Sequence, residues 1–259
     1  MLFFKRSPKP PPVVPAPDVP EQIPPVERRR ARRFKVQPEF PLRAVMSFVP
    51  RDDTGAPVSN SRHGWNWKGA LVDCSEQGLR VRLGPGVRTE VGETCEVRLS
   101  GTDYELSLSC LLSNLSEEKE GVLFGLQLEF ADPQNWQGYC RVLETVALSA
   151  ALKPEGRSAK PDESGYVVER YASDCASSLT AWRHPDGGEV SAFELVMRDW
   201  TARAATGQEA EYFSNSESGS RPATSAHTIE IHRWFQWAAG NLPPAVTADV
   251  RAFVRGFAK

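Results

Sequence analysis

Two short segments of this 259-residue chain carry side chains whose types and spacing could bind an anion. The first runs from Glu27 to Phe34 and holds five arginines within six positions. The second lies downstream and follows the pattern Asp-x-Ser-x-x-Gly at Asp73, Ser75 and Gly78. A guanidinium pairs bidentately with a phosphate or a guanine edge and stacks on a base, which lysine does not. Taken alone, each segment would also fit a solvated basic patch or a common turn.

The combination of the two segments resembles the signature of the PilZ family. Arg29 and Arg33, separated by three residues, supply the first half, and Asp73, Ser75 and Gly78 supply the second. The family consists of small β-barrel domains that act as receptors for the bacterial second messenger cyclic di-GMP. The resemblance covers roughly the stretch from the arginine run to residue 150 and implies that these five residues bind cyclic di-GMP.

The resemblance also implies a role for each residue. The two arginines would close over the ligand from one side, in the manner of a lid. Asp73 would accept hydrogen bonds from guanine N1–H and N2–H, and Ser75 would bond a phosphate or a base edge. Gly78 would keep the wall low enough for a base to approach.

The register of the arginine pair has an alternative one residue earlier, because Arg28 and Arg32 have the same spacing. We prefer the later register because Phe34 and Val36 then lead directly into a strand. The arginines outside the preferred pair are further candidate contacts: Arg28, Arg30 and Arg32. The site calls for no catalytic residue, no metal and no cofactor.

The sequence that follows the arginines predicts a mainly β fold. Several short segments are apolar or alternate with period two, separated by turns rich in Gly, Pro and acidic residues. They span residues 40–49, 67–73, 79–83, 95–99, 105–112 and 122–130. This spacing is typical of an antiparallel barrel, and the family resemblance implies six strands. Asp132 and Pro133 then predict the start of a helix that carries an apolar stripe.

The remainder of the chain predicts a smaller α+β domain. Strands are expected at 166–171, 178–183 and 193–197, a loop at 215–226, and two amphipathic helices near 231–238 and 246–257. Trp237 fits its helix stripe less well than Trp234 and is expected to be more exposed. The predicted organisation is a Pro-rich linker at 1–26, a barrel domain at 27–152, a linker at 153–164 and the α+β domain at 165–259.

Charge and cysteine content narrow the class of protein. Residues 1–36 carry nine Lys/Arg and three Asp/Glu, a charge of +6 within a net charge of −2. A basic arm on an acidic body favours an anion-binding element over a nucleic-acid polymer surface. The five cysteines form no Cys-x-x-Cys pair, which favours reduced thiols. The sequence contains no apolar run of transmembrane length and no signal peptide, so a cytoplasmic protein is expected.

The alternatives to a receptor are a ligand-free scaffold or interaction module, and an enzyme with its site in 165–259. The titratable residues available to such an enzyme are His184, His227, His232, Asp174, Glu194, Asp199, Glu230 and Asp249. They match no recognised catalytic motif, so we predict that the protein is not an enzyme. A receptor of this kind would act on a protein partner, which the sequence does not identify, and could form a ligand-dependent homodimer.

Overall fold

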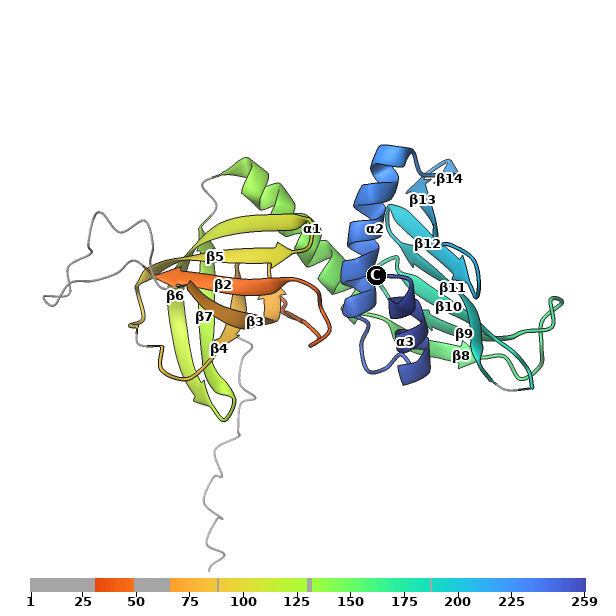
Figure 1. The fold of residues 1–259 in the computed structure, drawn as a ribbon, viewed down its shortest axis with the longest axis horizontal. Coiled ribbons are helices and arrows are strands. Elements are labelled where there is room, and N and C mark those ends of the chain that lie inside the picture. The colour runs from red at the N-terminus through yellow and green to blue at the C-terminus, as the bar shows by residue number, and fades with distance from the viewer. Residues whose placement is uncertain (1–30, 49–65, 88, 130–131, 187) are drawn as a thin grey trace, which may run out of the picture. The chain divides into compact units, whose positions relative to one another are not determined.

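The computed structural model describes residues 31–48, 66–87, 89–129, 132–186 and 188–259 (Figure 1). The predicted Pro-rich linker and the candidate contacts Arg28, Arg29 and Arg30 lie outside these residues. No helix among the described residues is long and apolar enough to span a membrane.

The first half of the described chain forms a closed antiparallel barrel, as predicted. Its sheet has the strand order β1-β3-β2-β5-β6-β7-β4, and pairing of β3 with β4 closes a six-stranded barrel to which β1 adds a short edge. The strands are β1 (Phe34–Lys35), β2 (Arg43–Phe48), β3 (Asn66–Ser75), β4 (Gly78–Leu83), β5 (Thr94–Gly101), β6 (Tyr104–Glu118) and β7 (Gly121–Glu129).

Period-two alternation explains the closed form of this sheet. In β5, Cys95, Val97 and Leu99 are buried while the residues between them face outward. The same alternation recurs in the neighbouring strand β6. Because the buried positions of these two strands are apolar, closing the sheet buries them in one core and leaves few unpaired edges.

Helix α1 (Pro133–Ala150) follows the barrel and begins where the sequence predicted. The Asp132 carboxylate accepts a hydrogen bond from the Gln134 N–H at 2.8 Å, and Pro133 occupies the first turn. Tyr139, Val142 and Val146 pack into the barrel core. Leu148, near the helix C-terminus, belongs to a second core.

The second core lies between a seven-stranded antiparallel sheet and two helices. The sheet order is β14-β13-β12-β11-β10-β9-β8. The strands are β8 (Lys153–Arg157), β9 (Val167–Ala172), β10 (Ser178–Arg183), β11 (Val190–Met197), β12 (Trp200–Ala205), β13 (Glu211–Ser216) and β14 (Gly219–Pro222). Helices α2 (Ser225–Gly240) and α3 (Ala248–Gly256) contact β11, β12 and β13. The α+β class predicted for this part is therefore confirmed.

Two stretches predicted as irregular form strands. Strand β8 lies in the predicted linker at 153–164; its Pro154 is tolerated because β8 is an edge strand with a bulge between Pro154 and Gly156. The predicted loop at 215–226 contains the end of β13, the turn, β14 and the first residues of α2. Its polar side chains stabilise the turn locally, since Ser220 Oγ donates to Asn215 Oδ1 at 2.8 Å.

Helix α2 contributes to both cores, which overturns one expectation. Trp237 is only 2% exposed and packs edge-to-face on Tyr104 of the barrel, with ring centroids 4.8 Å apart. Phe235, two residues earlier, belongs to the second core. The expectation of an exposed Trp237 was wrong because the helix has two buried faces, and a single apolar stripe describes only one of them.

The end of α2 fits closely against the start of the barrel. A Cβ atom at Gly240 would lie 2.6 Å from the Glu39 carbonyl oxygen, so only glycine permits this approach. Next to it, the buried Asn241 accepts a hydrogen bond from the Gln37 N–H at 2.8 Å and donates to Ser149 Oγ at 3.0 Å. Residues 31–259 accordingly form one compact unit. The domain limits at residues 152 and 165 stay predictions.

A buried arginine holds α3 against the second sheet. The Arg183 side chain is 5% exposed; it donates to Glu169 Oε2 at 2.7 Å and also pairs with Asp249 in the first turn of α3. The hydrogen bond from Arg183 holds the pKa of Asp249 well below its usual value. A depressed folded-state pKa stabilises the fold above the unfolded pKa of about 3.9 and loses that effect as the pH falls below it.

We expect Asp249→Asn to lower the free energy of unfolding at pH 7 by about 1–2 kcal/mol, because Arg183 keeps Glu169 but loses one charge-assisted partner. Urea unfolding at pH 7 and between pH 4 and 2.5 measures the effect. The wild type should lose stability faster than the variant at low pH, so that the two converge. Asp174→Asn, which changes a 95% exposed carboxylate, is the control. A constant difference at every pH would contradict this account.

Candidate functional site

Strand pairing brings the two predicted motif segments together at one edge of the barrel. Phe34 of β1 pairs with Cys74 of β3, and Lys35 pairs with Asp73. The Val36 N–H then donates to the Val72 carbonyl at 2.9 Å and extends the pairing. This register places Arg33, the residue before β1, next to the end of β3.

Asp73 is the centre of this edge. Its side chain is 5% exposed, and Arg33 Nη1 donates to Oδ1 at 2.7 Å. Arg80 of β4 pairs with the other carboxylate oxygen, Oδ2. Both carboxylate oxygens therefore have a cationic partner, as a buried charge requires.

Arg80 was not among the predicted site residues. The sequence placed it on the outward face of the strand at 79–83, and β4 has that alternation. A bulge between Leu71 and Asp73 shifts the register of β3, so that Asp73 lies opposite Arg80. The hydrogen bond with Asp73 raises the pKa of Arg80. A bulge has no reliable signature in a single sequence, so pattern reasoning had no means of finding this pair.

Ser75 and Gly78 form the turn between β3 and β4. The Ser75 hydroxyl donates to the Gly78 carbonyl at 3.1 Å, and Ser75 is 2% exposed. From α1, the Tyr139 hydroxyl donates to the Ser75 carbonyl at 2.7 Å and lies 3.3 Å from that of Gly78. Burial raises the pKa of Tyr139, so its phenol remains a donor at neutral pH. The turn is thus anchored to α1.

Gly78 has a structural requirement of its own. A Cβ atom there would lie 2.2 Å from the Leu126 carbonyl oxygen of β7. Because Gly78 has no side chain, β4 and β7 can lie close together, and this requirement is independent of any ligand. The role predicted for Gly78 toward a base stays a prediction.

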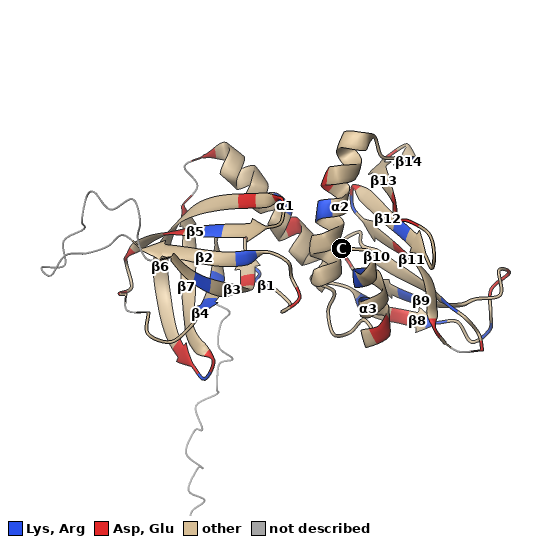
Figure 2. Cartoon of the chain, in the orientation of Figure 1, with Lys and Arg blue, Asp and Glu red and all other residues tan. Residues whose placement is uncertain are grey.

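The electrostatic balance at this edge is positive. Arg33 and Arg80 retain side-chain exposures of 26% and 35% beside a single buried carboxylate. Arg32, directly upstream, holds its guanidinium carbon 5.2 Å from the centroid of the Phe34 ring. Figure 2 marks the Lys and Arg positions of β1 and β4 in blue. Partly exposed guanidinium groups in excess of carboxylates can take an anion from solvent.

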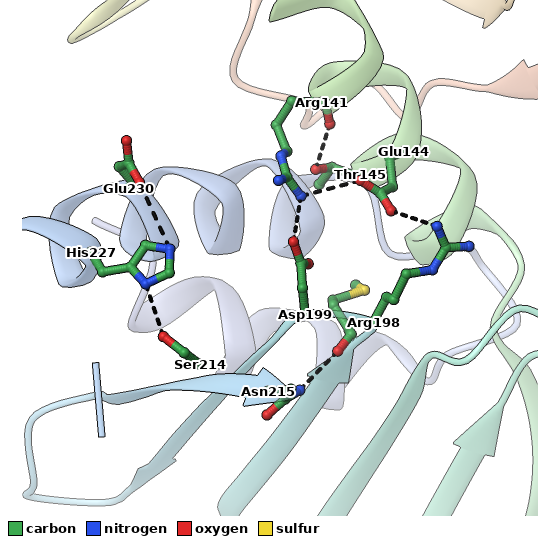
Figure 3. A network of polar contacts seen from close by, with 10 residues as sticks. Arg141, Glu144, Thr145, Arg198, Asp199, Ser214, Asn215, His227 and Glu230 are labelled. Atoms are coloured by element: carbon green, nitrogen blue, oxygen red, sulfur yellow. Dashed lines mark hydrogen bonds and ion pairs between the residues drawn. The ribbon is translucent and has the colours of Figure 1, made fainter. Parts of the chain in front are cut away.

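Another polar cluster superficially resembles a catalytic triad (Figure 3). Ser214 Oγ lies 2.9 Å from His227 Nδ1, and His227 Nε2 lies 3.8 Å from a Glu230 oxygen. The histidine and glutamate side chains are 42% and 56% exposed, so the pair is weak. Ser214 lies within β13 and pairs with Trp200 on one side and Arg221 on the other.

The other titratable residues considered for an enzyme mostly have structural partners. Asp199 pairs with Arg141, Glu194 with Arg203 and Asp249 with Arg183. His232 lies between Tyr212 and Gln236, and burial lowers its pKa. No group of three metal-binding side chains occurs in the part of the chain that the structure describes.

A network of charges links α1 to the second sheet (Figure 3). Arg141, two residues after Tyr139, donates to Asp199 at 2.8 Å and to Glu144 at 3.1 Å. Its guanidinium carbon lies 4.3 Å from the ring centroid of Trp234 on α2. Arg198 also pairs with Glu144, at 3.0 Å. Helix α1 therefore contacts the Ser75–Gly78 turn with one residue and the second core's elements with another.

Comparison with known proteins confirms the family resemblance read from the motifs. The model of the PilZ domain family matches residues 27–142. The solved PilZ domain with c-di-GMP of YcgR from Escherichia coli is 12% identical, with 47% of this chain and 92% of that chain covered and a TM-score of 0.34. The Borreliella burgdorferi PlzA protein in complex with c-di-GMP is 11% identical, with 80% and 94% covered and a TM-score of 0.28. No curated protein matches the chain.

We expect Gly78→Ala to lower the free energy of unfolding by about 2–3 kcal/mol, because the new methyl group forces β4 away from the Leu126 carbonyl. Gly84→Ala is the matched control, since a Cβ there meets nothing within 4 Å. Urea unfolding of both variants without ligand measures the difference. Equal stability of the two variants would show that Gly78 has no packing role.

Proposed function

We propose that the PilZ domain at residues 27–142 binds cyclic di-GMP through Arg29, Arg33, Asp73, Ser75 and Gly78. The observation that carries the proposal is the contact between Arg33 and Asp73, at 2.7 Å, which joins the two halves of the motif. Two residues forty positions apart meet because β1 pairs with β3. The position of this pair at a positive edge of the barrel fits a ligand that has two phosphates and two guanines.

Binding proceeds by exchange of partners at Arg33. A phosphate of the ligand takes the Arg33 guanidinium, which pairs with phosphate oxygens in the same planar, bidentate manner as with a carboxylate. Arg29 and the further candidates Arg28, Arg30 and Arg32 stand just before Arg33 in the sequence and add positive charge. The Asp73 oxygen that Arg33 releases then accepts from guanine N1–H and N2–H.

Arg80 lowers the energetic cost of this exchange for a buried carboxylate. Asp73 is 3% exposed, and an unpaired charge at that burial would be strongly unfavourable. Arg80 remains paired with Oδ2 throughout, so Asp73 keeps a cationic partner and its orientation while the other oxygen changes partner. Ser75 contributes by turning its hydroxyl from the Gly78 carbonyl toward the ligand.

Helix α1 passes the change at the turn to the rest of the molecule. A ligand on Ser75 alters the carbonyls to which Tyr139 donates, and Tyr139 lies two residues from Arg141. Arg141 in turn contacts Asp199 and Trp234 (Figure 3). The receptor thus changes the contacts between the barrel and the second sheet, and through them the surface offered to a protein partner.

The alternatives are a ligand-free barrel scaffold and an enzyme. A ligand-free scaffold would have the same fold as a receptor and would differ only in not binding cyclic di-GMP. The binding experiment below therefore decides between a scaffold and a receptor. An enzyme is less well supported, because the histidine and glutamate of the Ser214–His227–Glu230 cluster are 42% and 56% exposed and interact weakly. A cytoplasmic location and a ligand-dependent homodimer are further parts of the proposal.

We expect Arg33→Ala and Asp73→Asn to weaken cyclic di-GMP binding at least tenfold, with similar losses for Arg29→Ala and Ser75→Ala. Loss of a charge-assisted hydrogen bond is worth about 1.5–3 kcal/mol, or roughly 10–150-fold in affinity. Calorimetric titration of the full chain measures it. Arg82→Ala, on the same strand as Arg80 but paired with Glu118 and Glu120, is the control and should bind within about threefold of wild type. No heat and no thermal shift in the wild type would reject the receptor and leave the scaffold.

Coupling is tested by Arg141→Gln, with exposed Gln137→Ala on the same helix as control. We expect Arg141→Gln to bind cyclic di-GMP within about threefold of wild type, because the contacts that it removes lie away from the ligand. Hydrogen exchange should show that the ligand slows or accelerates exchange around Asp199 and Trp234 in wild type and in the control. That response should be absent from Arg141→Gln. A response of undiminished size in the variant would exclude this route.

A further inference from the structure

A cavity of about 560 Å³ lies where the barrel meets α2 and the C-terminal residues. On the barrel side it is lined by residues 39, 41 and 42 and by the turn at 101–104. On the other side are residues of α2, including His232, Arg233 and Trp237, and then Arg255 and Lys259. A volume of this size is in the range that holds a small organic ligand. Of the predicted cyclic di-GMP residues that the structure describes, none lines it.

Arg233 is the distinctive residue of this cavity. It has no hydrogen-bond or ion-pair partner among residues 31–259 as far as the structure describes them. Its guanidinium carbon lies 5.9 Å from the ring centroid of Tyr104. By contrast, Arg255 at the same cavity is paired with Glu39 at 3.3 Å. Because Arg255 is paired with Glu39, the one other side-chain carboxylate in the lining is that of Asp103.

Aromatic and apolar groups complete the lining. Tyr104 is half-buried, and burial raises its pKa to about 12, so the ring is uncharged at neutral pH. Its hydroxyl group lies 3.3 Å from the Gly138 carbonyl oxygen, to which it donates. Ile229, a large apolar side chain with 65% exposure, also lines the cavity and offers apolar area to a ligand. The cavity therefore offers a cation without a carboxylate partner beside an aromatic ring and an exposed aliphatic group.

We propose that this cavity binds a small aromatic oxyanion, a phosphate or carboxylate attached to a planar ring. The oxyanion pairs bidentately with Arg233, which a guanidinium does with either group. The ring packs on Tyr104 and Ile229, where apolar area is removed from water. Such a ligand touches the barrel through Tyr104 and α2 through Arg233, so it bridges the same two parts of the molecule that the Arg141 network connects.

The test is calorimetric titration of the full chain with phenyl phosphate, with benzoate and with neutral benzyl alcohol. We expect saturable binding of at least one anion, and at least tenfold weaker binding of the alcohol. Arg233→Gln should weaken the anion at least tenfold, whereas Arg221→Gln, an exposed arginine of β14, should leave it unchanged. Tyr104→Phe keeps the ring and should retain binding. The two anions distinguish a phosphate from a carboxylate site.

Two results would overturn the proposal. One is the absence of saturable binding of both anions to wild type. The other is unaltered binding by an Arg233→Gln variant whose thermal unfolding matches wild type. Because Arg33→Ala should bind the aromatic anion normally, failure here is distinguishable from failure of the cyclic di-GMP site.

Discussion

The need to compensate the buried charge of Asp73 governs the organisation of this edge of the barrel. A carboxylate with a 5% exposed side chain cannot remain ionised without cationic partners, and it has two, Arg33 and Arg80. One partner comes from the segment before β1 and the other from β4, so the ion pairs tie the entry of the chain to the closing strand of the barrel. The bulge in β3 places the carboxylate where both can reach it.

The two cores share their helices, and this limits how independently they can move. Helix α1 packs Tyr139 into the barrel and Leu148 into the second core, while α2 does the same with Trp237 and Phe235. A displacement of either helix must therefore change packing on both sides, since close-packed interiors have little slack. Polar contacts such as that of Arg141 with Asp199 can change more easily than this packing, because breaking a solvent-exposed ion pair costs little free energy.

Sequence reasoning reached the barrel, α1 and the α+β class because these depend on local periodicity and end signals. Period-two strands and the Asp132–Pro133 cap are visible in short windows. It failed where a tertiary partner decides the outcome. Trp237 is buried because a neighbouring barrel accepts it, and Pro154 joins a strand because its position is at an edge. Arg80 pairs with Asp73 because of a bulge, and Arg233 lines a separate cavity. A single sequence shows neither the bulge nor the cavity.

Asp73 has two arginine partners, Arg33 and Arg80, and this arrangement suits a ligand-dependent switch. If Arg33 were the sole partner, its departure would leave a bare buried carboxylate, and the ligand would have to offset that cost in full. With Arg80 fixed on Oδ2, the departure of Arg33 frees only one oxygen, which a guanine edge can occupy. The folded state without ligand is then fully paired, and so is the proposed bound state. When the Asp73 carboxylate is fully paired in both states, a ligand that binds one state more tightly can shift the population toward it.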